Sequence, residues 1–446
     1  TTPNEFLEKN ALILHTQNDL KTWQESYRKQ SSMLAQLDLS VSPTLDQEAL
    51  QIELKRCETK INELFERLYL QQATRQLVPR EEKGTHRGTP LLNIAQLQQR
   101  LVPGQLLLAY FLHKEQLVIF AVTTEYLIAR DIPNGAQQLK HLLPFLHAHL
   151  QPGGWPDPQQ PPQQAIRQVL RKLYALLITP VVDYLPALHE QIVIVPYGPL
   201  HTLPFHALYD GTRFLIEQFQ ISYLPASNLL TQVETSAIDT TAYANVQPPL
   251  VFGSSGQGYL QHALIEAKML ANMLKARCYL EEEATITRLS EQAPGSPIIH
   301  LATHGYSRLD APNFSAVSLV DGRFNAIDAF SLDLQGCELV TLSGCETGLA
   351  LSGGGDEQSG LGRAFLASGV HTLVMSLWPV EDSATSELMQ LFYQNLLRGD
   401  NKVQALCDAQ RTLIQSTHPA HTHPYYWAAF RLVGATGPLR SLKRLN

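Results

Sequence analysis

Apolar residues follow a helical period in the first part of the chain. Leu20, Trp23 and Tyr27 fall near a 3.6-residue spacing, and the apolar residues of 50–68 do the same. This spacing places apolar side chains on one face of a helix. The pattern predicts an N-terminal helical segment over 1–78. Its two antiparallel helices fit the end of a helical repeat array, although one pair shows no measurable period.

Short apolar runs replace the helical period after a polar linker at 79–90. Residues 105–132 contain three runs rich in β-branched and aromatic residues, separated by polar breaks, and this predicts an antiparallel meander. A helix over 165–178 and the buried strand QIVIVPYG follow. A second polar linker is predicted over 233–249.

The remainder of the chain alternates apolar strands with helices. The strands read PLVFGSS, PIIHLATHG, CELVTLSG and HTLVMSLW, and helices are predicted near 263–275, 360–368 and 382–397. This alternation predicts an α/β fold, in which helices cover both faces of a mostly parallel sheet. Functional residues of such sheets gather just beyond the carboxyl ends of the strands.

Composition limits the class of protein. The 446 residues are 44% hydrophobic and 17% charged, which is typical of a soluble globular protein with two or three domains. A formal net charge of −7 gives no reason to expect direct binding of nucleic acid or of an anionic membrane. No stretch approaches 18 uninterrupted apolar residues, so we expect no membrane span.

Cysteine usage bears on the compartment. The five cysteines form no CxxC pair and no dense framework, which is typical of a cytosolic protein. No basic and apolar leader opens the sequence, so we expect a cytoplasmic location. Residue 1 is threonine rather than methionine, which leaves room for residues upstream.

Two predicted strands end in residues that suit nucleophilic catalysis. PIIHLA is followed by Thr303, His304 and Gly305, and LVTLSG is followed by Cys345. A thiolate is the nucleophilic form of cysteine, and a neighbouring imidazole can stabilise it and later protonate a leaving amine. The pattern therefore favours Cys345 as nucleophile and His304 as general base and acid.

The backbone around these residues completes the hypothesis. Glycine at 305 allows the backbone to approach a substrate closely, and the amides of Gly305 and Cys345 would form an oxyanion hole. The residues alone also allow a simpler interpretation, in which Cys345 is a core residue and His304 only a hydrogen-bonding partner.

Several motifs in order raise the weight of the catalytic interpretation. Together they closely resemble the CHAT family, the caspase-like and separase-like domains that are often attached to tetratricopeptide repeats. The resemblance covers about 100–435. The motifs are VPYGPLHTLPFHALYD, ISYLPASNLL, HLATHG, LSGCETG, SLWPVED, LMQLFYQNLLRGD and YWAAFRLVG.

The resemblance implies a function and a domain plan. It implies a caspase-like three-layer α/β/α sandwich with cysteine peptidase activity, in which the motif histidine falls on His304 and the motif cysteine on Cys345. The catalytic CHAT domain would occupy 248–446, preceded by a degenerate caspase-like (pseudo-caspase) domain over 90–235. We expect a protein substrate, no metal and no cofactor. An activator protein or complex would act through the N-terminal helices.

The resemblance also bears on specificity. Several caspase-like peptidases that cleave after Arg or Lys carry an aspartate two residues before the nucleophile, where this chain has Ser343. A serine leaves a buried guanidinium unpaired, so we expect an uncharged residue before the scissile bond. The residues predicted to line the pocket are Ser343, Met375, Ser376, Leu377 and Trp378, and Asp356 or Glu357 of the glycine-rich segment 351–360 are the alternative source of charge.

Other chemical signals are weaker. We interpret His300 as structural, and the histidines at 418, 421 and 423 as a surface loop, because no cysteine or carboxylate lies near them. GSSGQG at 253–258 lacks a complete phosphate-binding motif and is interpreted as a loop. Two other functions stay open, namely a caspase-like signalling scaffold with little or no turnover and a different acyl-transfer hydrolase.

Overall fold

The computed structural model contains two compact units. They are Thr1–Asn93 and Ile94–Asn446. The linker predicted at 79–90, the glycine-rich segment up to 359 and Cys345 lie outside the described residues. The structure describes residues 3–35, 45–76, 94–151, 163–227, 230, 247–256, 258, 260–306, 308, 311–344, 360–416 and 420–441.

Two long helices form the described part of the first unit. They are α1 (Pro3–Ala35) and α2 (Leu45–Gln76), and they pack against each other. Leu20 of α1 and Ile61 and Leu64 of α2 are buried. These residues are among the apolar positions that recur with the helical period in the sequence. They are buried because that face of each helix packs away from water.

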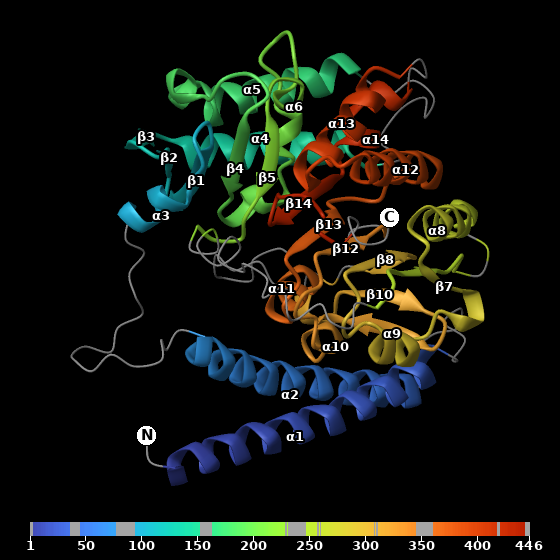
Figure 1. Cartoon of the computed structure of the whole chain (residues 1–446). Coiled ribbons are helices and arrows are strands. Elements are labelled where there is room, and N and C mark those ends of the chain that lie inside the picture. Colours follow the sequence, from blue (N-terminus) through green and yellow to red (C-terminus); the bar gives the residue numbers. More distant parts are fainter. Residues whose placement is uncertain are drawn as a thin grey trace. The chain divides into compact units, whose positions relative to one another are not determined.

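One eleven-stranded sheet runs through the second unit (Figure 1). Its strands pair in parallel except at β3–β2, β2–β1 and β14–β13, so the predictions of a mostly parallel sheet and of an antiparallel meander are confirmed. In spatial order the strands are β3 (Leu127–Ile132), β2 (Gln116–Val122), β1 (Leu106–His113), β4 (Gln191–Val195), β5 (Gln220–Tyr223), β14 (Phe430–Gly434), β13 (Thr372–Ser376), β12 (Leu339–Leu342), β8 (Ile298–Ala302), β6 (Leu250–Gly253) and β7 (Arg277–Leu280).

The C-terminal half of this unit, residues 247–441, has helices on both faces of its part of the sheet (Figure 1). α8 packs against β6, β7, β8 and α12, while α11 packs against β13 and α10. Every residue of β6, β8, β12, β13 and β14 is consequently buried. The helices of this unit include α3 (Ile94–Arg100), α4 (Gly135–His149), α5 (Gln163–Leu177), α6 (Leu215–Gln218), α8 (Gln261–Leu274), α9 (Ile286–Gln292), α10 (Ala326–Phe330), α11 (Leu361–Ala367), α12 (Asp382–Arg398), α13 (Lys402–Ile414) and α14 (Pro424–Trp427).

A small antiparallel sheet follows β8 directly. It consists of β9 (Gly305–Tyr306), β10 (Ala316–Leu319) and β11 (Gly322–Asn325), with β10 in the centre. Because β9 starts one residue after His304, the backbone of this histidine is held between the large and the small sheet.

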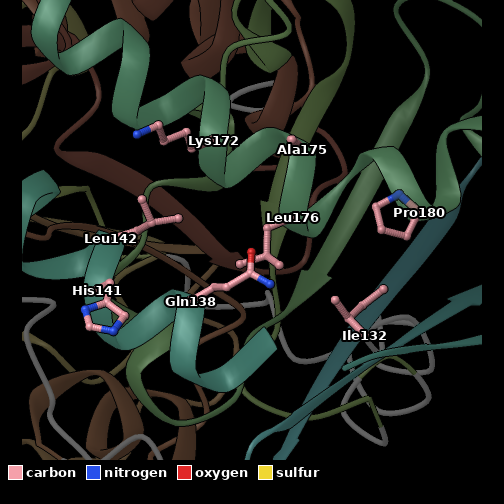
Figure 2. A pocket seen from close by; sticks show the side chains of 8 residues that line it. All are labelled: Ile132, Gln138, His141, Leu142, Lys172, Ala175, Leu176 and Pro180. Atoms are coloured by element: carbon pink, nitrogen blue, oxygen red, sulfur yellow. The ribbon is translucent and has the colours of Figure 1, made fainter. Parts of the chain in front are cut away.

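A groove lies in the N-terminal half of the second unit, residues 94–230 (Figure 2). It lies between α4 and α5 and has a volume of about 550 Å³. Leu142 and Leu176 give it an apolar lining, and Lys172 and His141 stand at its polar positions. None of the described residues at the carboxyl ends of β8 and β12, near His304, lines this groove.

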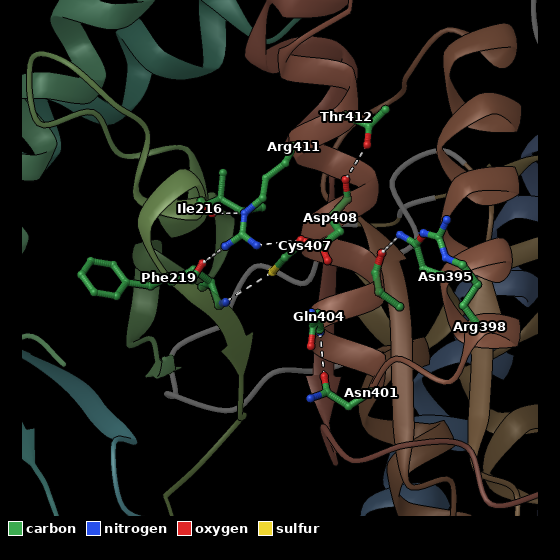
Figure 3. A network of polar contacts seen from close by, with 12 residues as sticks. Ile216, Phe219, Asn395, Arg398, Asn401, Gln404, Cys407, Asp408, Arg411 and Thr412 are labelled. Carbon is green, nitrogen blue, oxygen red and sulfur yellow. Dashed lines mark hydrogen bonds and ion pairs between the residues drawn. The ribbon is translucent and has the colours of Figure 1, made fainter. Parts of the chain in front are cut away.

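Helix α13 ties the C-terminal half to the N-terminal half (Figure 3). The Arg411 guanidinium donates from Nε to the carbonyl of Ile216 (2.7 Å) and from Nη2 to the carbonyl of Phe219 (3.0 Å). Its Nη1 also bonds to Asp408 at 2.7 Å, which fixes the orientation of the guanidinium. The two halves therefore share hydrogen bonds as well as the sheet.

The motif VPYGPLHTLPFHALYD contributes a second connection. Arg431 of β14 donates to the carbonyl of His201 at 2.7 Å, and the His206 ring lies 3.0 Å from the carbonyl of Ala428. Burial lowers the pKa of His206 to about 3, so this histidine is neutral in the folded protein.

Within the described ranges, no helix combines the length and the apolar composition that crossing a bilayer requires.

Candidate active site

His304 stands at the carboxyl end of β8, as its position in the sequence predicted. Its carbonyl accepts a hydrogen bond from Ser318 N at 2.8 Å, which fixes the main chain between β8 and β10. The residue is partly exposed. Among the described residues, none forms a hydrogen bond with its ring. The imidazole is therefore available to a group arriving at this edge of the sheet.

The strand that precedes Cys345 ends beside His304. β12 pairs with β8 in parallel, and Ser343 N donates to the carbonyl of Leu301 at 2.9 Å. A Cβ atom on Gly344 would stand 2.9 Å from Gly305 N and would overlap the carbonyl oxygen of Thr303. Only glycine allows this approach, because any side chain would push the two strand ends apart.

Cys345 follows Gly344 directly in the chain. The cysteine lies outside the described residues, and so do Asp356 and Glu357. The structure therefore brings the residue before the predicted nucleophile into contact with the residues on both sides of the predicted base.

The backbone amide of Gly305 faces the same edge. Gly305 is paired with Val317, one position beyond the hydrogen-bonded pair of His304 and Ser318. In an antiparallel ladder the hydrogen-bonded pairs alternate with pairs whose N–H groups point away from the partner strand. The Gly305 N–H thus points away from β10, and its nitrogen lies on the side of Gly344.

The loop after β6 supports the His304 ring. β6 is the neighbour of β8, and Ser254 N donates to the carbonyl of Ala302 at 3.0 Å. Gly256, with φ +57°, lies so close to the ring that a Cβ atom would overlap Cδ2 and Nε2 of His304. The sequence of this segment predicted only a loop, and the glycines that follow β6 were the signal available for a close approach.

A carboxylate holds this loop in place. Ser255 donates to Glu281 from its backbone nitrogen (3.1 Å) and from its hydroxyl (2.5 Å). Ser255 Oγ in turn accepts from Gly258 N at 3.0 Å. Glu281 has φ +46°, an uncommon conformation for a residue with a side chain. Its bonds to Ser255 connect β7 to the loop that contacts His304.

A small cavity of about 20 Å³ lies on the other side of Gly344. Ser343 and Ser376, two of the residues predicted to line a specificity pocket, border it, and Ser376 Oγ donates to the carbonyl of Gly344 at 2.6 Å. The Ser343 hydroxyl oxygen is buried and forms no hydrogen bond with the described residues. The cavity thus combines an unpaired hydroxyl with apolar neighbours such as Val380 and Phe430, and it has room for roughly one water molecule.

Asp382 also lines this cavity, which the sequence did not indicate. Its Oδ2 accepts from His262 N at 2.7 Å, at the start of α8. Burial raises the pKa of Asp382, although the bond from His262 opposes this change. The side chain of an acidic residue thus lies at the wall of the candidate specificity pocket.

The other predicted pocket residues lie in the core of the sheet and just beyond it. Met375 and Leu377 are buried, and Trp378 donates from Nε1 to the carbonyl of Tyr425 at 3.0 Å. Of the described residues that line the 20 Å³ cavity, only Ser376 comes from the predicted run 375–378. The contribution of the other three to substrate binding stays a prediction.

The cysteines seen in the second unit are poor candidates for a nucleophile. Burial raises the pKa of Cys337 to about 12 and that of Cys407 to about 11, and it also raises the pKa of Cys278. These thiols are protonated near neutral pH, whereas nucleophilic attack requires a thiolate.

His300 forms a buried network beneath the site. Its Nε2 lies 2.7 Å from Glu266 of α8, and its Nδ1 lies 3.2 Å from the Tyr393 hydroxyl of α12. Tyr393 also bonds to Thr341 of β12 at 2.9 Å. The network connects the strands that end at His304 and Gly344 to the helices above them, in line with the structural role inferred for His300.

The histidines near the C-terminus have protein partners. His421 Nδ1 lies 3.2 Å from Glu387, and His423 Nδ1 accepts from Tyr425 N at 3.1 Å. Across the described ranges, no group of three potential metal ligands comes together.

Comparison with known proteins gives one family and several relatives. A family model described as the CHAT domain matches residues 167–435. Two curated proteins called "Tetratricopeptide repeat protein 28" are similar to 61% of this chain. The human protein is 25% identical over 338 residues and the mouse protein 26% over 330. The chain spans only 13% of the length of either relative.

A solved structure is similar in fold. A chain in the crystal structure of the Saccharomyces cerevisiae separase–securin complex superposes with a TM-score of 0.51. The match covers 96% of this chain and 37% of that chain, at 10% sequence identity. The similarity concerns the fold alone, and it confirms the caspase-like α/β architecture expected from the sequence.

Proposed function

Because the chain belongs to the CHAT domain family, we propose that it is a caspase-like cysteine endopeptidase that cleaves a protein substrate with His304 and Cys345. The observation that carries the proposal is the contact of Gly344 with Thr303 and Gly305. It supports a short distance between residue 345 and His304, because Gly344 immediately precedes the cysteine.

The proposed reaction passes through an acyl-thioester. The Cys345 thiolate attacks the carbonyl carbon of the scissile peptide bond, and His304 donates a proton to the amine that leaves. His304 then accepts a proton from water, whose oxygen attacks the thioester and releases the acid product. The amides of Gly305 and Cys345 would stabilise the negative charge that develops on the carbonyl oxygen.

This proposal requires no metal and no cofactor. The proposed place of action is the cytoplasm, in keeping with the cysteine usage. The proposed activator is a protein or complex that binds the N-terminal helical segment. Deleting residues 1–78 should abolish the response to that activator, while reaction of Cys345 with a small thiol probe should persist.

A peptide-based electrophile tests the enzyme directly. Wild-type protein should be labelled at Cys345, and Cys345→Ala should lose the label while keeping its far-UV circular dichroism. His304→Ala should slow labelling at neutral pH by about 10²-fold, since it removes the base that favours the thiolate. Cys278→Ala is the matched control and should react like the wild type.

The same proteins separate the peptidase from its alternatives. A lysate treated with wild-type protein should contain new protein N-termini that are absent after treatment with Cys345→Ala. Since the His304 imidazole and the Cys345 thiol act as one unit, the double variant Cys345→Ala/His304→Ala should be no less active than either single variant. Labelling of Cys345 without cleavage of any protein would instead favour another acyl-transfer hydrolase. An unreactive Cys345 would favour the scaffold.

A further inference from the structure

A second polar cavity lies at the opposite end of the sheet from His304. Its volume is about 460 Å³. The C-terminal half contributes Glu338 before β12, His371 before β13 and Lys402 at the start of α13. The N-terminal half contributes residues of β4 and β5, so the cavity spans the junction between the two halves.

Lys402 is the unusual member of this lining. The residue is only 4% exposed. Its backbone nitrogen donates to Gly437, whereas its ammonium group has neither a hydrogen bond nor an ion pair with any described residue. Burial of most of this side chain costs the ammonium group part of its hydration, which a bound anion at the cavity would offset.

The nearby carboxylate does not remove this cost. Glu338 is buried, and its oxygens accept from Arg440 N (2.7 Å) and Ser441 N (2.8 Å). Its negative charge raises the pKa of Lys402, but burial has the larger effect and lowers that pKa to about 8. Lys402 is thus still mainly protonated at neutral pH, and further negative charge beside it would be stabilising.

The opposite wall offers hydrogen-bond donors. Gln105 Nε2 donates to Gln191 Oε1 at 3.0 Å, and Gln191 Nε2 donates to Ser222 Oγ at 2.8 Å. In these two hydrogen bonds the Gln191 Oε1 and Ser222 Oγ oxygens are acceptors. The hydroxyl hydrogen of Ser222 can therefore be donated to a ligand in the cavity. Arg440, which is exposed, adds a guanidinium at the cavity.

The first turn of α13 adds a further positive contribution. Lys402 is the first residue of this helix, and Asn401 caps it by accepting from Gln404 N at 2.8 Å. The partial positive charge of a helix N-terminus disfavours an ammonium group and favours an anion. The helix end and the buried lysine therefore select for the same kind of ligand.

We propose that this cavity binds a small anion that carries a phosphate or carboxylate group, with Lys402 as its central contact. The volume lies within the range of ordinary small-molecule sites and is sufficient for a mononucleotide. A ligand at this place touches residues of both halves of the sheet, so it stabilises their junction. The site is independent of the dyad and stands or falls separately from the proposed peptidase activity.

Thermal unfolding with three probes tests the site. Inorganic phosphate, citrate and adenosine 5′-monophosphate at about 10 mM are compared with chloride at equal ionic strength. At least one probe should raise the Tm of the wild-type protein by about 2 °C or more. Comparing phosphate with citrate shows whether the site prefers a phosphate or a carboxylate group. Adenosine 5′-monophosphate shows whether the cavity also accommodates a nucleoside.

Two variants connect the effect to the cavity. Lys402→Met should lose the rise in Tm, whereas Lys402→Arg, which keeps the charge, should retain part of it. Lys172→Met is the matched control, because it removes one positive charge from the groove of about 550 Å³ and should respond like the wild type. An equal rise in Lys402→Met and in the wild type would overturn the proposal.

A measurement on the wild-type protein removes the dependence on variants. Lysine acylation at pH 8, read by peptide mass spectrometry, reports the access of reagent to each ammonium group. The effective probe should slow acylation of Lys402 by at least about 5-fold and leave that of Lys172 unchanged, at a concentration well above its Kd. The proposal is wrong if none of the three probes raises the Tm or protects Lys402.

Discussion

Gly256 lies directly against the imidazole ring of His304, on the side of β6. The nearest ring atoms to a Cβ at this position are Cδ2 and Nε2, and Cγ lies at 3.4 Å. Because Glu281 holds the neighbouring Ser255 by two hydrogen bonds, the loop cannot retreat without losing them. The position of the proposed base thus depends on a residue about 50 positions earlier in the chain.

Replacing Gly256 tests this dependence. Gly256→Ala should displace the His304 ring and lower kcat/KM by about 10²-fold, since small misplacements of a catalytic group have effects of that size. The measurement is peptide hydrolysis or the rate of Cys345 labelling, together with the Tm.

Gly258→Ala provides the matched control for that variant. Gly258 also has a positive φ, of +93°, but a Cβ there meets no atom within 4 Å. The two variants therefore share backbone strain and differ in the contact with His304. Equal losses of activity in both would contradict a role for Gly256 in positioning the base.

The cavity beside Gly344 predicts the residue before the scissile bond. Ser343 brings no charge and the cavity is small, so we expect a small uncharged residue at this position of the substrate. Profiling a peptide library with active protein measures the preference.

A preference for Arg would contradict this expectation, and the structure supplies a way to find its cause. Asp382→Asn would then remove the carboxylate that lines the cavity. Loss of the Arg preference in that variant would identify Asp382 as its source. Retention would direct attention to Asp356 or Glu357.

Acid should destabilise the protein through His206. The pKa of this buried histidine is about 3 in the folded state, whereas a histidine in the unfolded chain has a pKa near 6.5. The unfolded state therefore binds the extra proton between these values, and stability falls as the pH drops below about 6.5. The loss attributable to His206 is about 2 kcal/mol on going from pH 6.5 to 4.5.

Urea unfolding at several pH values checks the prediction. His206→Gln should flatten the decrease of stability below pH 6.5, whatever its effect at neutral pH. His141→Gln is the control, because His141 is exposed and lies in the groove of Figure 2. An unchanged slope in His206→Gln would refute the assignment.

Glu266 and His300 should be energetically coupled. Both side chains are buried and lie 2.7 Å apart, so Glu266→Leu leaves the histidine without this partner and should cost about 3–5 kcal/mol. Combining Glu266→Leu with His300→Leu should cost clearly less than the sum of the single changes. Additive losses in urea unfolding would exclude coupling.

The sequence by itself determined the local elements and their order. Apolar runs predicted the meander of β1 to β3 and the buried strands β8, β12 and β13, and these predictions are confirmed. His304 was placed at the carboxyl end of β8 because the continuous apolar run of a buried strand stops just before it. Such features depend on neighbours in the chain, which the hydrophobic pattern records directly.

Only the tertiary structure decided which distant residues meet. Three contacts join segments that are far apart in the chain. β5 pairs with β14, Gly256 lies against the His304 ring, and Asp382 lines the small cavity beside Gly344. Likewise, only the structure shows that Lys402 is buried and that its ammonium group forms no hydrogen bond or ion pair with a described residue, although its sequence context is that of an ordinary first turn of a helix. These features follow from how helices and strands pack around one sheet. Packing depends on the shapes of surfaces that local periodicity does not encode.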